Sequence, residues 1–298
     1  MKAYRLTARD GYPLSVHTFD TENPKAVIQI IHGMEEHQER YEPFIRFLNQ
    51  NGYSVVSSDM RGHGSGALDL GYFKEKKGYV ELIADQVKIR KLIARKYPAV
   101  PVFLFAHSMG TIIARVMLQT QSEKYDKVVL SGYPNYRWQA CFGLFLSSVI
   151  MAWKGPKYKS GFLQYTSIGV FNKSIKHASS DIDWISSNPE TIKAYKEDSL
   201  CGIGFTCSAF HDLYHLLFLM HKPCNYRCLN KTLPILMLRG LDDPCTGGDK
   251  GSRDSFTVLS RAGFSKIKLI DYPNMRHELL NEIDYLKVYK DILDFYND

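Results

Sequence analysis

The chain has 298 residues, of which 45% are hydrophobic and 23% are charged. This length is too great for most small single-core modules, and it suits one large α/β domain with an insertion, or two domains. The formal net charge is +7, but the basic residues are scattered between acidic ones. No RNP-like, zinc-finger or helix-turn-helix signature is present, so we expect no nucleic-acid partner.

The amino terminus enters strand-like sequence directly and lacks the apolar core and cleavage site of a signal peptide. The longest apolar patch, residues 142–153, is interrupted by glycine and serine. It falls short of the ~18 residues of a spanning helix. We therefore expect a cytoplasmic protein. Six cysteines without a zinc-type spacing predict reduced thiols, no metal and no cofactor.

In the first 133 residues, strand-like and helix-like stretches alternate. Residues 1–20 predict two strands around a turn at 10–13, and the apolar runs 26–31, 53–57, 102–107 and 127–131 predict buried strands. Apolar residues at helical spacing predict helices over 39–51, 79–96 and from 109 onward. This alternation indicates a mostly parallel sheet with helices on both faces.

The alternation stops between residues 134 and 229, which are rich in aromatic residues and contain no strand pattern. Strand-like runs return at 233–238 and 266–270, with helices expected near 254–262 and over 279–296. We therefore predict one α/β core formed by residues 1–133 and 230–298. Residues 134–229 are predicted to be a mostly helical cap inserted into it.

The most informative stretch is 102–111, in which an apolar run ends in small residues around Ser108 before helical spacing resumes. This pattern predicts a strand, a sharp turn and a helix, with Ala106 and Gly110 allowing close backbone approach. A serine hydroxyl becomes a nucleophile only with a base, an orienting acid and oxyanion donors. Past the insertion, one strand ends in Asp242 and Asp243, and the next ends before His277, so the required residue types follow in order.

Taken together, the sequence resembles the monoacylglycerol lipase and lysophospholipase (serine aminopeptidase-like) branch of the α/β-hydrolase superfamily. The shared pieces are HGMEEH at 32–37 with RY at 40–41, RGHGS at 61–65, AHSMG at 106–110, GLDDP at 240–244 and HE at 277–278. The motif usually begins with glycine where Ala106 stands. The resemblance implies an eight-stranded, mostly parallel sheet with a helical cap.

By this resemblance Ser108 is the nucleophile and His277 the general base. Asp243 aligns with the acid, with the adjacent Asp242 as the competing candidate. The backbone N–H groups of Met34 and Met109 would form the oxyanion hole. We predict the substrate-binding residues to be His32, His107, Phe142, Phe145 and Trp153.

Two further predictions concern charged residues outside the triad. Asp59 and Arg61 are expected to form a structural ion pair, and the basic run 154–159 either is solvated or is weakly attracted to anionic lipid head groups. The cap therefore makes at most weak peripheral contact with a membrane. The oligomeric state is left open.

The resulting hypothesis is a serine carboxylester hydrolase for single-chain acyl esters of monoacylglycerol or lysophospholipid type, or for small esters. One alternative is a small-peptide aminopeptidase, thioesterase or acyltransferase on the same scaffold. An aminopeptidase needs acidic residues in the cap, and Glu190, Glu197 and Asp198 are available. The other alternative is a ligand-binding protein that has lost turnover.

Overall fold

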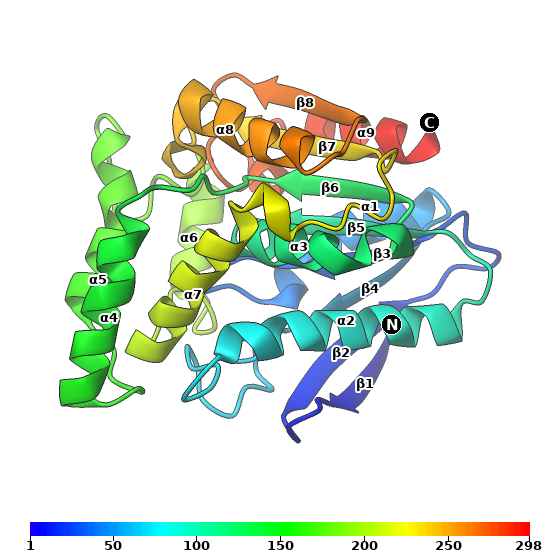
Figure 1. The fold of residues 1–298 in the computed structure, drawn as a ribbon. Helices are drawn as coiled ribbons and strands as arrows, with labels where there is room; N and C mark the ends of the chain where they lie inside the picture. Colours follow the sequence, from blue (N-terminus) through cyan, green and yellow to red (C-terminus); the bar gives the residue numbers. More distant parts are fainter.

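The computed structural model describes residues 1–298, which form one eight-stranded sheet in the order β1-β2-β4-β3-β5-β6-β7-β8 (Figure 1). β2 pairs antiparallel with β1 and β4, and all other neighbours are parallel. The strands are β1 (Lys2–Thr7), β2 (Pro13–Phe19), β3 (Val27–Ile31), β4 (Ser54–Ser58), β5 (Val102–His107), β6 (Lys127–Ser131), β7 (Ile235–Gly240) and β8 (Ile267–Tyr272).

The central strands are buried on both faces, as their continuous apolar runs predict. Gln29 is the polar exception in β3. Its amide donates to the side chain and carbonyl of Gln86, and its oxygen accepts from the Tyr125 hydroxyl, so its polar groups are satisfied inside the core. Because these strands are parallel, the residues that follow them meet at one edge of the sheet.

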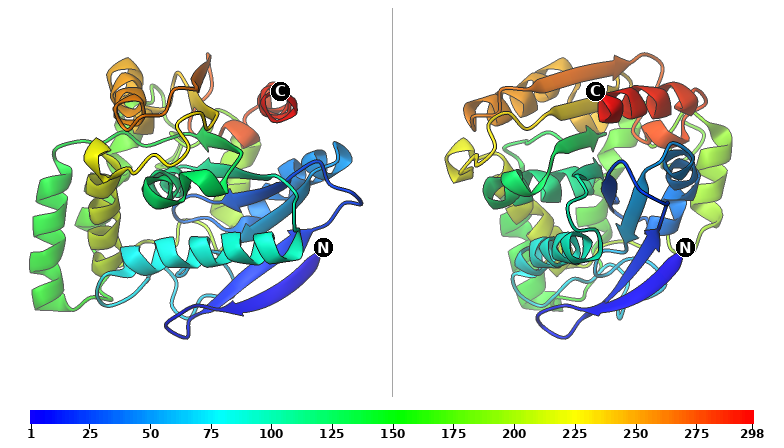
Figure 2. Two further views of the ribbon diagram at one scale, coloured as in Figure 1. Left: turned by 45° about the vertical axis from the view of Figure 1, so that its right-hand side comes forward. Right: turned by 90° about the vertical axis from the view of Figure 1, so that its right-hand side faces the viewer.

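Helices cover both faces of this sheet, and each face has its own apolar core. Leu82 and Ile112 pack in one cluster, whereas Phe44 and Val288 pack in the other. Figure 2 shows α2 and α3 on the opposite side of the sheet from α9. The core helices are α1 (Glu42–Gln50), α2 (Gly78–Lys96), α3 (Met109–Gln121), α8 (Gly248–Arg261) and α9 (Tyr285–Asn297), with 3-10 turns η1 (Gln38–Tyr41), η2 (Ser122–Lys124), η5 (Pro244–Thr246) and η6 (Leu279–Asn281).

Residues 134–229, called the insertion below, join β6 to β7 and contain no strand. They lie beyond the carboxyl ends of the strands (Figure 1). Within the insertion α4 packs along α7, and α7 also contacts α2 and α3 of the core. Its elements are α4 (Ala140–Lys154), α5 (Gly161–Ser167), η3 (Gly169–Ser174), α6 (Pro189–Glu197), α7 (Cys207–Met220) and η4 (Pro223–Asn225).

Two helices differ from the sequence prediction. α8 begins six residues before the expected start. Its start was missed because the two glycines there, Gly247 and Gly248, are typical of a loop, and both have a positive φ. The expected helix over 279–296 is divided into η6 and α9. Glu282 is extended there, and its carboxylate accepts the N–H groups of Ser187 and Arg276. No helix of the chain combines the length and apolar composition needed to span a bilayer.

Candidate active site

Ser108 lies at the turn between β5 and α3 with a φ of 50° and a ψ of −122°. This φ is unfavourable for a residue with a side chain, so the turn is strained. Gly110 makes the turn possible: a Cβ there would lie 2.3 Å from the Ile31 carbonyl oxygen and 2.6 Å from that of His32. The helix therefore passes against the end of β3 with only a hydrogen between the two backbones.

Three chain-distant side chains meet at this turn. The Ser108 hydroxyl lies 2.7 Å from Nε2 of His277, and Nδ1 of His277 lies 2.8 Å from Oδ2 of Asp243. Asp243 is buried, and its other oxygen accepts the N–H of Cys245 at 2.8 Å. Asp242 is exposed. Of the two neighbouring aspartates, only Asp243 orients the histidine.

The surroundings of His277 raise the pKa of its imidazole. Burial alone would lower the pKa of His277, but the charge and hydrogen bond of Asp243 outweigh burial. Glu278 adds to this effect, so the pKa of His277 lies above its usual value. A proton on Nε2 is therefore well stabilised, as a general base requires. The rings of Trp184 and His107 lie with their centroids 4.9 Å from the His277 ring.

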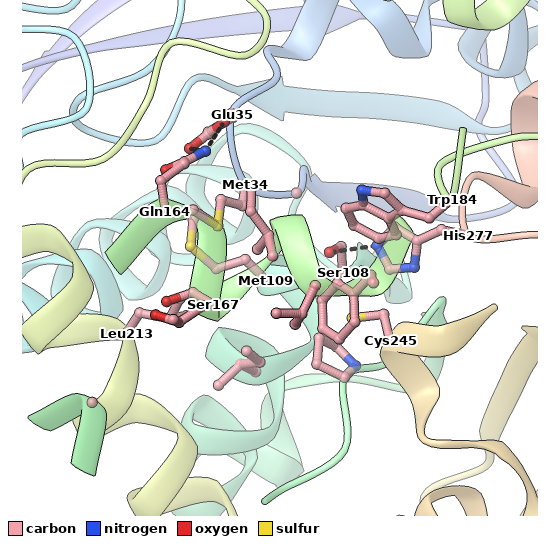
Figure 3. Close-up of a pocket in the computed structure, with 18 of the residues that line it drawn as sticks. Met34, Glu35, Ser108, Met109, Gln164, Ser167, Trp184, Leu213, Cys245 and His277 are labelled. Carbon is pink, nitrogen blue, oxygen red and sulfur yellow. Dashed lines mark hydrogen bonds between the residues drawn. The ribbon is translucent and has the colours of Figure 1, made fainter. Parts of the chain in front are cut away.

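Two backbone N–H groups are available beside Ser108. Met109 is the first residue of α3, so its N–H has no partner within the helix. Met34 follows β3, and its N–H makes no backbone hydrogen bond. The side chains of Met34 and Met109 lie beside Ser108 in Figure 3. This arrangement can offer two donors to one oxygen anion.

A buried charged network supports the loop that carries Met34. The carboxylate of Glu36 accepts the N–H of Gly33 and, at 2.7 Å, the hydroxyl of Tyr41. Arg40 donates to Glu36 at 2.9 Å and bidentately to Glu278 at 2.6 and 2.7 Å. Arg40 therefore links the loop after β3 to the residue that follows His277.

Ser108 and His277 open into a cavity of about 740 Å³ between the sheet edge and the insertion (Figure 3). Half of its 36 lining residues are hydrophobic. The apolar part lies between α3, α4 and α7 and is lined by Ile112, Ala140, Phe142, Leu146, Leu213 and Leu217. The polar part includes Glu35, Glu36, Gln164, Tyr195 and Glu278. The cavity is large enough for a small lipid-like ligand.

Only two of the five predicted substrate-binding residues line the cavity. His107 and Phe142 line the cavity, whereas His32, Phe145 and Trp153 do not. His32 is fully buried beneath the loop, where Nε2 accepts the Met60 N–H and Nδ1 donates to the Gly33 carbonyl. Burial lowers its pKa to about 3. Phe145 is 70% exposed and Trp153 81% exposed, because α4 turns this face to the outside.

The predicted ion pair of Asp59 and Arg61 was also wrong. Arg61 instead pairs with Asp85 at 2.7 Å and with Asp10 at 3.0 Å, while Asp59 accepts from the backbone and side chain of Gln38. Both side chains therefore tie loops to the core away from the cavity.

The insertion carboxylates considered for binding an ammonium group do not line the cavity either. Glu190 and Glu197 are exposed, and Asp198 accepts from His37 at 2.7 Å. This placement gives no support to the aminopeptidase alternative.

The insertion contributes cavity residues that the sequence did not reveal. The Trp184 ring lies tilted against the His277 ring, and Gln164 and Tyr195 donate hydrogen bonds to Glu35 in the loop after β3. They come from segments without regular spacing relative to the core, so no sequence pattern linked them to the site. Of the core residues that line the cavity and were not predicted as site residues, Glu35, Glu36 and Glu278 had a local signal, because they stand inside the motifs HGMEEH and HE.

Two clusters bring ligand-type side chains within reach of a common ion. One is Asp243, Cys245 and His277, and the other is His37, Asp198 and Cys201. In each cluster the histidine and the aspartate are already hydrogen-bonded to each other.

The strained serine turn, the linked histidine and aspartate, and the eight-stranded sheet define a hydrolase of the α/β-hydrolase superfamily. The sequence profile described as "Serine aminopeptidase, S33" matches residues 22–284. The chain therefore belongs to this family, in its monoacylglycerol lipase and lysophospholipase branch.

Relatives agree with this assignment. A monoacylglycerol lipase of Mycolicibacterium smegmatis is 25% identical over 280 residues, covering 93% of this chain and 89% of the relative. The phospholipase YtpA of Bacillus subtilis is 30% identical over 188 residues, covering 61% and 63%. Among solved structures, a thermostable carboxyl esterase from Bacillus coagulans matches the fold with a TM-score of 0.92 at 23% identity, covering 99% of this chain and 97% of that one.

Proposed function

We propose that the protein is a serine carboxylester hydrolase that cleaves single-chain acyl esters through an acyl-enzyme on Ser108. The observation that carries this proposal is the hydrogen-bonded chain from Ser108 through His277 to Asp243, at a cavity that has an apolar part between α3, α4 and α7. The names of the two sequence relatives, a monoacylglycerol lipase and a phospholipase, agree with an acyl ester as substrate.

In the first step Ser108 Oγ attacks the ester carbonyl carbon while its proton passes to Nε2 of His277. Asp243 stabilises the imidazolium that forms, and the N–H groups of Met34 and Met109 hold the oxygen anion. The alcohol then leaves with the proton from His277. Water, activated by the same histidine, attacks the acyl-enzyme and releases the carboxylic acid and the free serine.

The apolar part of the cavity supports an acyl chain as the recognised group. Ile112, Leu213 and Leu217 would contact its methylenes. Each buried CH₂ contributes about 0.8 kcal/mol, so chains that fill this space should be preferred by several-fold per carbon until the space ends. The polar part, near Glu36 and Tyr195, leaves room for the alcohol group.

The outer face of α4 supports a further part of the proposal, in which the protein makes weak contact with a lipid surface and takes its substrate from it. Its exposed apolar side chains lie on one side of the helix, and Phe162 of α5 is exposed as well. Lys154 lies over the Trp153 ring, and aromatic rings with a neighbouring cation suit the head-group region of a bilayer. The outer patch is defined as Phe145, Val149 and Trp153, the exposed apolar side chains of α4 that do not line the cavity.

The test is a panel of nitrophenyl esters, monoacylglycerols and lysophospholipids of increasing chain length, with the Ser108→Ala variant in parallel. We expect hydrolysis that rises with chain length to an optimum and is lost in the variant. Equal rates for the wild type and Ser108→Ala would contradict the proposal. Faster cleavage of aminoacyl-arylamides than of any ester would favour the aminopeptidase alternative.

A further inference from the structure

Glu35 has a backbone conformation that is unusual for a residue with a side chain. It directly follows Met34 in the loop after β3 and has a φ of 56°, a value that glycine adopts freely and glutamate does not. It is also buried, although it carries a carboxylate. Such a conformation persists only where surrounding contacts hold it.

Those contacts come mainly from the insertion. The Gln164 side-chain nitrogen on α5 donates to both carboxylate oxygens of Glu35 at 2.8 and 3.0 Å. The Glu35 carbonyl accepts the Tyr195 hydroxyl of α6 at 2.9 Å and the Gly202 N–H at 3.0 Å. Three separate segments of the insertion therefore converge on one residue of the core loop.

The loop is thus held from two sides. On the core side the Glu36 carboxylate accepts the Gly33 N–H and Nε2 of His63 accepts the Glu35 N–H at 3.3 Å, whereas the insertion holds the carboxylate and the carbonyl of Glu35. Met34 lies between these points, and in Figure 3 it separates the Glu35–Gln164 pair from Ser108. The Met34 N–H belongs to the planar peptide unit that joins Gly33 to Met34, so contacts that hold Gly33 on one side and Glu35 on the other restrict how far this unit can turn.

We propose that the insertion orients the Met34 N–H through its contacts with Glu35. Gln164 and Tyr195 are then positioning residues for the hydrolysis proposed above. A movement of α5 or α6 would turn this donor away from the oxygen anion without displacing Ser108, His277 or Asp243. The inference rests on the proposed function, and it makes the insertion part of the reaction geometry in addition to a cover for the cavity.

Glu35→Gly is the most direct variant, since glycine adopts the positive φ of this position freely and removes the side chain that Gln164 holds. Gln164→Leu and Tyr195→Phe remove the donors on the insertion side, and Glu35→Gln restores a partner for Gln164. The measurements are kcat and KM on a short, water-soluble nitrophenyl ester, and the affinity for a boronic acid. The tetrahedral adduct of the boronic acid on Ser108 needs the same N–H donors.

We expect Glu35→Gly and Gln164→Leu to lower kcat about tenfold or more while KM changes less than about twofold, because a misaimed donor affects the transition state. Boronate affinity should fall in parallel, and Glu35→Gln should recover most of kcat. Asp69→Asn is the matched control, since it breaks another contact between core and insertion, the Lys157–Asp69 pair, far along the chain from this loop. It should leave both constants near the wild-type values.

The proposal is overturned if KM rises while kcat is unchanged, which would make Glu35 a substrate-binding residue. It is also overturned if Glu35→Gly and Gln164→Leu behave as Asp69→Asn does. Tyr195→Phe removes a single oxygen and keeps the test open if Gln164→Leu fails to fold. A wild-type protein that cleaves no ester would refute the proposed function itself, an outcome distinct from normal turnover with unaffected variants.

Discussion

Position 110 has no room for a methyl group. Its Cβ would lie 2.3 Å from the carbonyl oxygen of Ile31, a backbone atom that cannot rotate away. We expect Gly110→Ala to destabilise the fold by roughly 1–3 kcal/mol and to lower kcat by displacing Ser108. Denaturant unfolding and ester turnover measure the two effects. Gly161→Ala is the control, because nothing lies within 4 Å of its Cβ and both values should stay near those of the wild type.

The raised pKa of His277 should be visible in the pH dependence of kcat/KM. Because the pKa of His277 lies above its usual value, kcat/KM should fall on acidification at a pH above the usual histidine range, as the base becomes protonated. Asp243→Asn removes the charge that raises this pKa, so the acidic limb should move to lower pH and the rate should fall about a thousandfold or more. Asp242→Asn should change neither. A large loss for Asp242→Asn would reverse the assignment.

Much of this residue-scale arrangement could be predicted. Ser108, Asp243 and His277 each follow a core strand, and parallel strands bring such positions to one edge. The sequence favoured Asp243 over Asp242 as the acid, but both follow the same strand, and the structure separates them by burial and by the contact of Asp243 with His277. Trp184 could not be predicted, because a lone aromatic residue in an irregular segment has no pattern that ties it to a distant histidine.

Where α7 meets α2, a buried carboxylate has an unmet hydrogen bond. Asp212 Oδ2 has no partner, and a Cβ on Gly78 would lie 2.3 Å from it. Burial raises the pKa of Asp212 to about 7, although the N–H groups of Tyr79 and Gly78 and the charge of Arg61 oppose the shift. This contact is one of those that join the insertion to the core.

The sign of the pH effect follows from this raised pKa. Between about pH 4 and pH 7 the folded state keeps a proton on Asp212 that the unfolded chain has lost, so the free energy of unfolding should decrease as pH rises. Asp212→Asn should remove this decrease and be more stable than the wild type at pH 8 by roughly 2 kcal/mol. Asp284→Asn, at an exposed site, controls for the loss of one charge. Parallel pH curves for wild type and Asp212→Asn would contradict the prediction.

At the scale of elements, the strands were predictable and the insertion helices were less so. A nearly continuous apolar run such as 27–31, interrupted only by Gln29, predicts a strand buried on both faces in a chain of alternating elements. In the insertion, α5, η3 and α6 are short and joined by irregular segments, so periodicity gave no boundaries for them. Their positions depend on contacts with α7 and the core, which are not local in sequence.

For the whole molecule, we expect the outer patch to distinguish substrates in a membrane from substrates in water. Replacing Phe145 or Trp153 with Asp should lower activity on monoacylglycerol in anionic vesicles several-fold, because burial of each ring in the interface is lost. Activity on a water-soluble ester should stay within about twofold. Leu286→Asp, an exposed apolar site on α9, is the matched control. Equal losses on both substrates would show that the patch acts on folding or on the cavity.

The central claim is that the Ser108 hydroxyl is the activated nucleophile. Reaction with a fluorophosphonate followed by peptide mass spectrometry tests it most directly, with His277→Ala and Ser108→Ala alongside. The account predicts one covalent adduct on Ser108, strongly slowed in His277→Ala and absent in Ser108→Ala. An adduct on another residue, or none while a known serine hydrolase in the same tube is labelled, would contradict it.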